Sequence, residues 1–264
     1  MENLSRIPNL ICLWTFAGEK AFVSSGPRRY ELQPGNGSVN ILNDGCLSPD
    51  SIDLEEGQYL FIPRDQCPDL NIHGKDAQVT VLALVKRKRK SYNQCEAIAG
   101  MWNETEKLRQ YCLFLNLGIK DSGDQVCGHI SGVGGPTPGE RWCMDASIGT
   151  TPVVHDEWTF AAITYDGAWI KSYLDGKLDN RPGLNPYAYR EGIFDGGEDG
   201  SDFTVGAVHR SHEMGNFFVG QLGGLAVFNR ALSEREIGDI HKGVKASKWK
   251  LFNSAVWLNH RVKS

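Results

Sequence analysis

The stretch that most constrains the fold is residues 158–177, WTFAAITYDGAWIKSYLDGK. Apolar and polar side chains alternate in residues 159–165 and again in residues 168–174, a pattern typical of β-strands. Asp166-Gly167 separates them, and Asp-Gly is favoured in two-residue type I′ hairpins because both positions need positive φ. Asp175-Gly176 repeats this turn chemistry, so the stretch predicts an antiparallel hairpin followed by another tight turn.

The same alternation, interrupted by turn residues, continues along the chain. Further strands are expected at residues 10–16, 59–62, 78–85, 108–117, 125–131, 141–147, 203–209 and 217–228. Residues 78–85 are apolar on both faces, which predicts a central strand in a sheet packed on both sides. Helix is scarce: Ser233 and Glu236 form a capping box, and a short helix should run from there to about His241.

The chain shows no internal repeat and no linker. At 264 residues it is long for an average domain, but large all-β sandwiches reach this size as one unit. We therefore expect residues 1–264 to form a single two-sheet antiparallel β-sandwich, with a core at about 8–241 and residues 242–264 docked as a C-terminal extension. The extension carries the apolar residues Trp249, Phe252, Trp257 and Leu258.

Composition limits the classes of partner. Acidic residues number 32 and basic residues 28, a balance that argues against a nucleic-acid-binding protein. Two basic segments, residues 86–90 and 242–263, are either solvated surface or sites for an anionic partner. No stretch approaches the roughly 20 apolar residues of a membrane helix.

Compartment and thiol chemistry are less constrained. No signal-peptide pattern begins the sequence, which predicts a cytoplasmic protein, or a secreted one if a signal had been removed. Seven cysteines, an odd number without a CxxC motif, suggest free thiols and give no zinc-site spacing. One disulfide, such as Cys112 with Cys127, remains an alternative.

Residues 158–176 carry W-x-x-x-A-x-T-Y-D-G-x-x-I-K-x-Y-L-D-G, and residues 217–237 carry F-F-V-G-Q-L-G-G-L-A-V-F-N-R-A-L-S-x-x-E-I. In this order they resemble the laminin-G-like, concanavalin A-like jelly-roll family, and the match extends over about residues 8–241. The resemblance implies a jelly-roll sandwich whose relatives include lectins, calcium-dependent adhesion modules, glycosidases and polysaccharide lyases. The E-x-D-x-x-E motif of sandwich glucanases and the strand motifs of alginate lyases are absent from this sequence, which favours a binding module over an enzyme.

The candidate ligand-binding residues are aromatic and polar residues near the long loops. They are Trp102, Arg109, Tyr111, His129, Trp142, Asn185, Tyr187, Tyr189, His209, Arg210 and Glu213. Aromatic rings stack on the apolar faces of sugars, and arginine or amide groups bond their hydroxyls or carboxylates. The alternative is that the tryptophans are core residues and the tyrosines loop anchors. We expect a glycan to bind where residues 132–139 and 180–202 approach the strand ending at Arg210.

The alternative function is a polysaccharide-active enzyme, a uronate polysaccharide lyase more readily than a glycoside hydrolase. Its candidate catalytic residues are His129, His209, Arg210, Tyr187 and Tyr189. Histidine and tyrosine would move the C5 proton of a uronate while arginine neutralised the carboxylate. A cleft holding both histidines and a tyrosine together would favour this enzyme, whereas a face of aromatic rings would favour the module.

Two metal sites are conceivable. The glycine-rich segment with Asp195, Glu198, Asp199 and Asp202 could supply oxygen ligands to calcium, although it has no EF-hand spacing. A histidine pair with Glu213 could instead hold zinc. The sequence therefore predicts a lectin-like carbohydrate-binding module that recognises a glycan or polysaccharide through loops and one sheet face, with calcium as the favoured candidate cofactor. It does not name the glycan.

Overall fold

Two stacked β-sheets make up most of the computed structural model, which describes residues 4–261. Sheet I contains β1 (Leu10–Trp14), β3 (Asn40–Leu42), β4 (Ser51–Leu54), β6 (Val79–Arg87), β11 (Trp158–Tyr165), β12 (Trp169–Leu174), β13 (Lys177–Leu178), β14 (Tyr187–Ala188) and β18 (Gly220–Phe228). Sheet II contains β2 (Gln33–Pro34), β5 (Leu60–Ile62), β7 (Glu96–Asn103), β8 (Leu108–Leu115), β9 (Val126–Ile130), β10 (Ala146–Ile148), β15 (Phe203–Val205), β16 (Val208–Arg210) and β17 (Glu213–Gly215). Three short 3-10 helices are η1 (Gly18–Lys20), η2 (Arg64–Gln66) and η3 (Pro68–Leu70).

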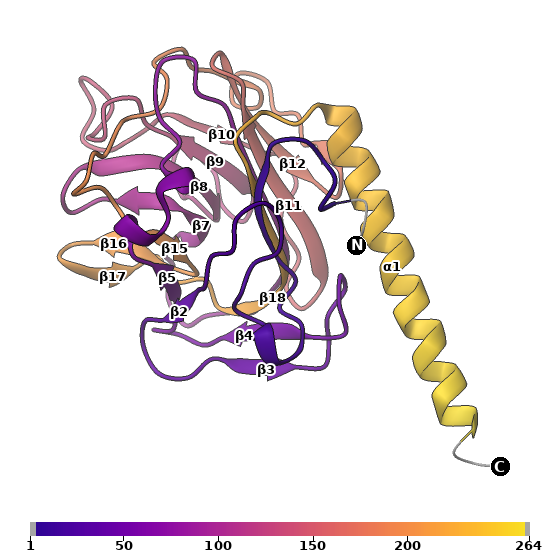
Figure 1. Cartoon of the computed structure of the whole chain (residues 1–264). Coiled ribbons are helices and arrows are strands. Elements are labelled where there is room, and N and C mark those ends of the chain that lie inside the picture. Colours follow the sequence, from indigo (N-terminus) through magenta and orange to yellow (C-terminus); the bar gives the residue numbers. More distant parts are fainter. Residues whose placement is uncertain (1–3, 262–264) are drawn as a thin grey trace.

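The strand orders are those of an antiparallel sandwich. Sheet I runs β13-β12-β11-β6-β18-β4-β3, and sheet II runs β10-β9-β8-β7-β15-β5-β2. Figure 1 shows sheet II, sheet I and the helix α1 (Glu234–Arg261) as successive layers from left to right. The expected all-β, two-sheet fold is confirmed.

The buried apolar residues form three clusters, because side chains alternate between the two faces of each strand. On β6, Val81, Ala83 and Val85 face the core between the sheets, whereas Leu82 and Leu84 belong to a second cluster on the outer face of sheet I. β6 lies between β11 and β18, which is the central position predicted for residues 78–85. A third apolar cluster lies on the outer face of sheet II.

The two Asp-Gly turns differ in their backbone. Asp175 and Gly176 both have positive φ, 48° and 76°, as a type I′ turn between β12 and β13 requires. At the first turn only Gly167 has positive φ, because the Asp166 carboxylate instead accepts the amides of Ala168 (2.9 Å) and Trp169 (2.7 Å). The β11–β12 turn is therefore tight, as predicted, but a side chain rather than a type I′ backbone closes it.

Helix α1 begins at the predicted capping box and runs further than expected. The Glu236 amide donates to Ser233 Oγ at 3.3 Å, and the Ser233 amide donates to Glu236 Oε2 at 2.8 Å. Ile237 and Ile240 then bury against the outer face of sheet I. The helix passes His241 and ends at Arg261, since no proline interrupts it, and its C-terminal half extends past the sheets (Figure 1).

The docked extension was predicted from the side chains of Trp249, Phe252, Trp257 and Leu258. For these residues the structure describes the helical backbone but not the side chains. Within residues 4–261, no helix is both long enough and apolar enough to cross a membrane. All seven cysteines fall in the described part of the chain and all are free thiols, so the alternative of a Cys112–Cys127 disulfide is wrong.

Candidate functional site

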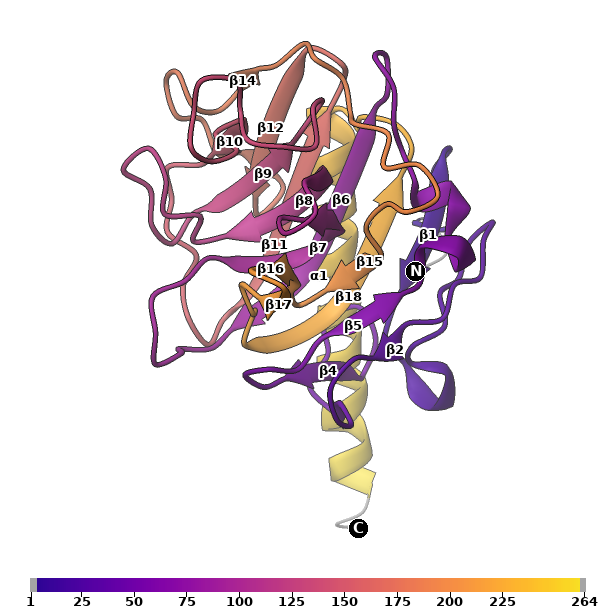
Figure 2. The same cartoon turned by 90° about the vertical axis from the view of Figure 1, so that its left-hand side faces the viewer.

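The outer face of sheet II carries a hollow of about 400 Å³, here called the sheet II hollow. It is lined by Asn93, Gln94, Cys95, Trp102, Glu104, Arg109, Asn116, Leu117, Gly118, Ile119, His129, Trp142, Cys143, Arg210 and Asn216. Figure 2 views this sheet from its outer side, with α1 behind the sandwich. The hollow and the helix therefore lie on opposite sides of the molecule.

A larger hollow, of about 810 Å³, lies between the N-terminal segment and α1. Among the described residues its lining contains no aromatic ring, and its arginines and carboxylates lie on the open surface of the helix and the N-terminal segment. The sheet II hollow is the better candidate because it combines aromatic rings with buried polar groups.

The floor of the sheet II hollow follows from strand alternation. Trp102 on β7, Phe114 on β8 and His129 on β9 all point outward, and their rings touch. The ring centroids of Trp102 and His129 are 4.7 Å apart. Three neighbouring strands thus supply a rigid aromatic floor.

A β-bulge places Arg109 beside this floor. Met101 on β7 opposes Tyr111 on β8, but Trp102 opposes Arg109, so Gln110 is the extra residue. In regular pairing Trp102 would face Gln110 and the Arg109 side chain would point toward the core. The bulge turns Arg109 outward, with its guanidinium carbon 5.9 Å from the centre of the Trp102 ring.

His129 is neutral in this setting. Burial lowers its pKa to about 3, and the positive charges of Arg109 and Lys120 act in the same direction. The neutral ring is assigned as donating from Nδ1 to the Asp145 carbonyl at 3.1 Å, which leaves the lone pair on Nε2.

The thiol of Cys143 lies 3.8 Å from His129 Nδ1. Burial raises the pKa of this thiol to about 11. Because the thiol is protonated and the imidazole neutral, the two groups do not form the thiolate–imidazolium pair of a cysteine nucleophile.

One wall of the hollow is a chain of polar side chains. Glu104 Oε1 accepts from Trp102 Nε1 at 3.3 Å and from Asn216 Nδ2 at 3.1 Å. Arg210 Nη1 donates to Asn216 Oδ1 at 3.0 Å, and Arg210 Nε lies 3.9 Å from Glu104 Oε2. These groups are held in place before any ligand arrives.

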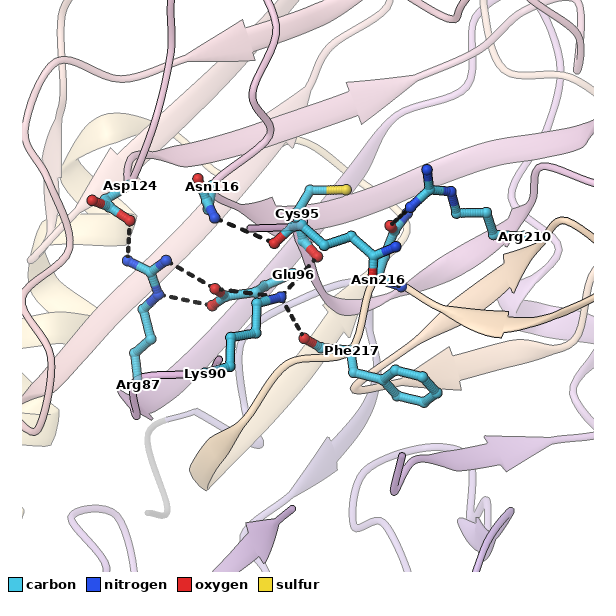
Figure 3. A network of polar contacts seen from close by, with 10 residues as sticks. Arg87, Lys90, Cys95, Glu96, Asn116, Asp124, Arg210, Asn216 and Phe217 are labelled. Carbon is cyan, nitrogen blue, oxygen red and sulfur yellow. Dashed lines mark hydrogen bonds and ion pairs between the residues drawn. The ribbon is translucent and has the colours of Figure 1, made fainter. Parts of the chain in front are cut away.

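A buried ion cluster supports the neighbouring wall (Figure 3). The Glu96 carboxylate accepts two bonds of 2.8 Å from Arg87 and lies 3.7 Å from Lys90 Nζ. Lys90 also donates to the carbonyls of Cys95 (3.3 Å) and Phe217 (3.0 Å). The segment 93–95 that lines the hollow is thereby tied to the body of the sandwich.

The same cluster explains the basic run at residues 86–90. Lys86 pairs with Asp44, and Lys88 pairs with Asp53 at 2.7 Å. Together with the contacts of Arg87 and Lys90, these pairs neutralise four of the five charges within the protein. The run is therefore not an open patch for an anionic partner.

Five of the eleven candidate ligand-binding residues meet in the sheet II hollow: Trp102, Arg109, His129, Trp142 and Arg210. Trp142 lies at the edge of the hollow and is 54% exposed. Ten lining residues were missed, among them Glu104, Asn116 and Asn216. The two asparagines have positive φ, 52° and 55°. An asparagine directly after an apolar strand was a signal for Asn116, which follows β8, but not for Asn216, which follows the short strand β17.

Three further candidates are buried elsewhere and bond to the protein itself. Tyr111 lies in the core between the sheets, and its hydroxyl donates to the Leu70 carbonyl at 2.8 Å. The Asn185 amide donates to the carbonyls of Ser172 (2.8 Å) and Asp179 (2.6 Å). The Tyr189 hydroxyl accepts the Gly132 amide at 2.6 Å, which makes Tyr189 a loop anchor.

The remaining three candidates line the surface outside the hollow. Tyr187 is half-buried under the ammonium of Lys120, which lies 4.2 Å from the ring centre. His209 Nε2 lies 3.9 Å from Asp202, and Glu213 is exposed on β17. The loop at 180–202 does not contribute to the lining, whereas the loop at 132–139 leads directly to Trp142.

This placement separates the candidate catalytic residues. His129 and Arg210 lie in the hollow, while His209, Tyr187 and Tyr189 do not. The lining of the hollow therefore does not bring both histidines and a tyrosine together.

The acidic loop is organised around a cation of the protein itself. Buried Arg64 donates from Nε (3.0 Å) and Nη2 (2.8 Å) to the Gly197 carbonyl. Asp195 accepts the Gly197 amide at 3.0 Å, and Asp202 accepts the Arg64 amide at 2.9 Å. In the described part of the chain, no three His, Cys, Asp or Glu side chains gather as metal ligands.

Comparison with known proteins agrees with this architecture. The family model described as the concanavalin A-like lectin/glucanases superfamily matches residues 55–238, and no curated protein matches the sequence. Domain 4 of the arabinanase AbnA from Geobacillus stearothermophilus, solved with arabinotriose, is similar in structure, with a TM-score of 0.57 and 13% identity over 88% of this chain and 98% of that domain.

The binding domain of botulinum neurotoxin DC in complex with SialylT is similar with a TM-score of 0.58 and 11% identity over 89% of this chain. A structure of botulinum neurotoxin type C, whose cell entry is described as dependent on two ganglioside molecules, has a TM-score of 0.55 and 10% identity over 92% of this chain. The present chain spans about half of each neurotoxin chain, 51% and 53%, and at these identities the likeness concerns the fold alone. On the strength of the family model, which matches most of its length, the chain belongs to the concanavalin A-like lectin/glucanase superfamily.

Proposed function

We propose that this protein is a lectin-like module that binds a glycan in the sheet II hollow. The observation that carries the proposal is Trp142, which exposes 54% of its surface at the edge of a hollow lined by fixed polar groups. An exposed indole beside convergent hydrogen-bonding groups suits a pyranose ring, which has an apolar face and a rim of hydroxyls.

The polar wall supports the same ligand class. Glu104, Asn216 and Arg210 are already held by one another, so little side-chain entropy is lost when they bond a sugar hydroxyl. The structural neighbours solved with arabinotriose and linked to gangliosides bind carbohydrate on a similar fold, which is consistent with the proposal by analogy.

Binding is favoured over catalysis because the hollow lacks a charged acid–base pair poised near neutral pH. The pKa of His129 is about 3 and that of Cys143 about 11, both moved away from neutrality by burial. The remaining carboxylate in the lining, Glu104, is engaged by Trp102 and Asn216.

The experiment is a glycan-array screen of the full chain, followed by calorimetry on the best ligand with Trp142→Ala. Losing one stacking ring should weaken binding by about 1 kcal/mol, or roughly fivefold in Kd. Trp169→Ala is the matched control, since Trp169 is 41% exposed on β12 of the opposite sheet.

Equal weakening by both variants, or none by Trp142→Ala, would remove the sheet II hollow as the binding site. An assay for unsaturated ends on uronate polymers, run beside the screen, tests the lyase alternative. We expect no such ends to form.

A further inference from the structure

Three arginine side chains are buried among the described residues, and they differ in how their charge is compensated. Arg87 has two bonds to Glu96 and lies 2.6 Å from Asp124. Arg64 has protein acceptors for Nε, Nη1 and Nη2. Arg64 is therefore hydrogen-bonded within the fold, and the charge of Arg87 is compensated there, with Nη1 in an ion pair rather than a hydrogen bond.

Arg109 is not satisfied in this way, although only 6% of it is exposed. Nη1 donates to the Gly134 carbonyl at 3.2 Å, and among the described residues Nε and Nη2 have no acceptor. No carboxylate of the described residues forms an ion pair with it, and the ring beneath it, Trp102, offers only a cation–π contact. Nε and Nη2 are not among the fully buried unpaired atoms of the described residues, so they reach solvent, while the residue as a whole is largely buried without a carboxylate partner. A guanidinium in this position gains from pairing with an anion.

The other charges in the hollow do not supply that anion. Glu104, the carboxylate in the lining, accepts from Trp102 and Asn216 and pairs with Arg210. His129 is neutral. Arg109 thus contributes an uncompensated positive charge to a site that is otherwise balanced.

We infer that the glycan bound in the sheet II hollow carries a carboxylate, as uronic and sialic acids do, and that this carboxylate pairs with Arg109. The inference rests on the proposed function. A guanidinium presents parallel N–H groups that match the two oxygens of a carboxylate. Two donors of Arg109 are available for such a pair, whereas a neutral sugar hydroxyl would leave the charge uncompensated.

The test compares each acid with a neutral counterpart on the full chain. The probes are trigalacturonate against its methyl ester, and sialyllactose against lactose, which separates a uronate from a sialate. We expect at least one acid to bind about tenfold or more tightly than its counterpart, because charge-assisted hydrogen bonds are about twice as strong as neutral ones.

Arg109→Gln should abolish that preference, while leaving the weaker binding of the neutral probe in place. Arg89→Gln is the control for long-range charge, because Arg89 is exposed and does not line the hollow. It should keep the preference. If Arg109→Gln fails to fold, as a melting curve would reveal, the comparison of acid and ester on the unaltered protein still decides the inference.

Equal affinity for acid and neutral probes, with Trp142→Ala weakening both, would overturn the inference and leave the proposed function standing. Absence of binding to any glycan, or indifference to Trp142→Ala, would overturn the proposed function as well.

Discussion

Replacing Glu96 by glutamine tests whether the buried ion cluster stabilises the sandwich. The substitution keeps the shape of the side chain and removes one negative charge between Arg87 and Lys90 (Figure 3). Burial lowers the pKa of Lys90. For Arg87, burial is outweighed by the contacts with Glu96 and Asp124, and its pKa is raised.

The expected magnitude follows from the burial of these groups. The side chains of Arg87, Lys90 and Glu96 are only 3%, 5% and 2% exposed. Removing one partner of a buried pair costs about 3–5 kcal/mol because the remaining charge is left without compensation. Asp124 keeps part of the Arg87 charge compensated, so we expect Glu96→Gln to lower the free energy of unfolding by about 3 kcal/mol.

The assay is urea unfolding at neutral pH, followed by circular dichroism. Asp124→Asn is the matched control, since it removes a carboxylate from the same arginine at a site 49% exposed, and exposed pairs contribute about 1 kcal/mol or less. A loss of unfolding free energy below about 1 kcal/mol for Glu96→Gln would refute this account of the cluster. So would a loss for Asp124→Asn that exceeds the loss for Glu96→Gln.

Two further predictions concern titration and metal binding. The pKa of His129 is about 3 in the folded protein and about 6.5 in an unfolded chain. Between these two pH values the unfolded state therefore binds one more proton than the folded state. The free energy of unfolding should fall as pH falls through this window, by up to about 1.4 kcal/mol per pH unit. Urea midpoints of the unaltered protein and of His129→Gln across this range measure the effect; parallel pH profiles would contradict it. In the loop from Asp195 to Asp202, the Arg64 guanidinium supplies the positive charge. We therefore expect melting curves in excess calcium and in excess chelator to coincide. A higher Tm in calcium would show that the loop binds the ion.

Much of the fold could be predicted because its signals are local. Alternation along a strand needs only neighbouring residues, so residues 78–85 were enough to predict a central strand packed on both faces. Turn and cap chemistry is equally local, as Asp175-Gly176 and the Ser233–Glu236 box illustrate. The helix end expected near His241 was wrong, because the helix continues through Gly243 to Arg261.

The site was only partly predictable, because its geometry depends on pairing between distant segments. Trp102, His129 and Trp142 were candidates as residue types, but the sequence alone did not separate them from Tyr111, which alternation directs into the core. A single extra residue in β8, the bulge at Gln110, decides that Arg109 faces outward.

The charges of the basic run and of the acidic loop show the same limit. Their compensation comes from residues far along the chain: Lys88 pairs with Asp53, and Arg64 reaches Gly197. Sequence determined many of the strands and turns, since each side chain's direction there follows from its neighbours, but the strand β7, which carries Trp102, was not expected. The tertiary structure decided which charges are neutralised and that the charge of Arg109 in the hollow has no carboxylate partner among the described residues. The reason is that Coulombic and hydrogen-bonding partners are set by distance in space.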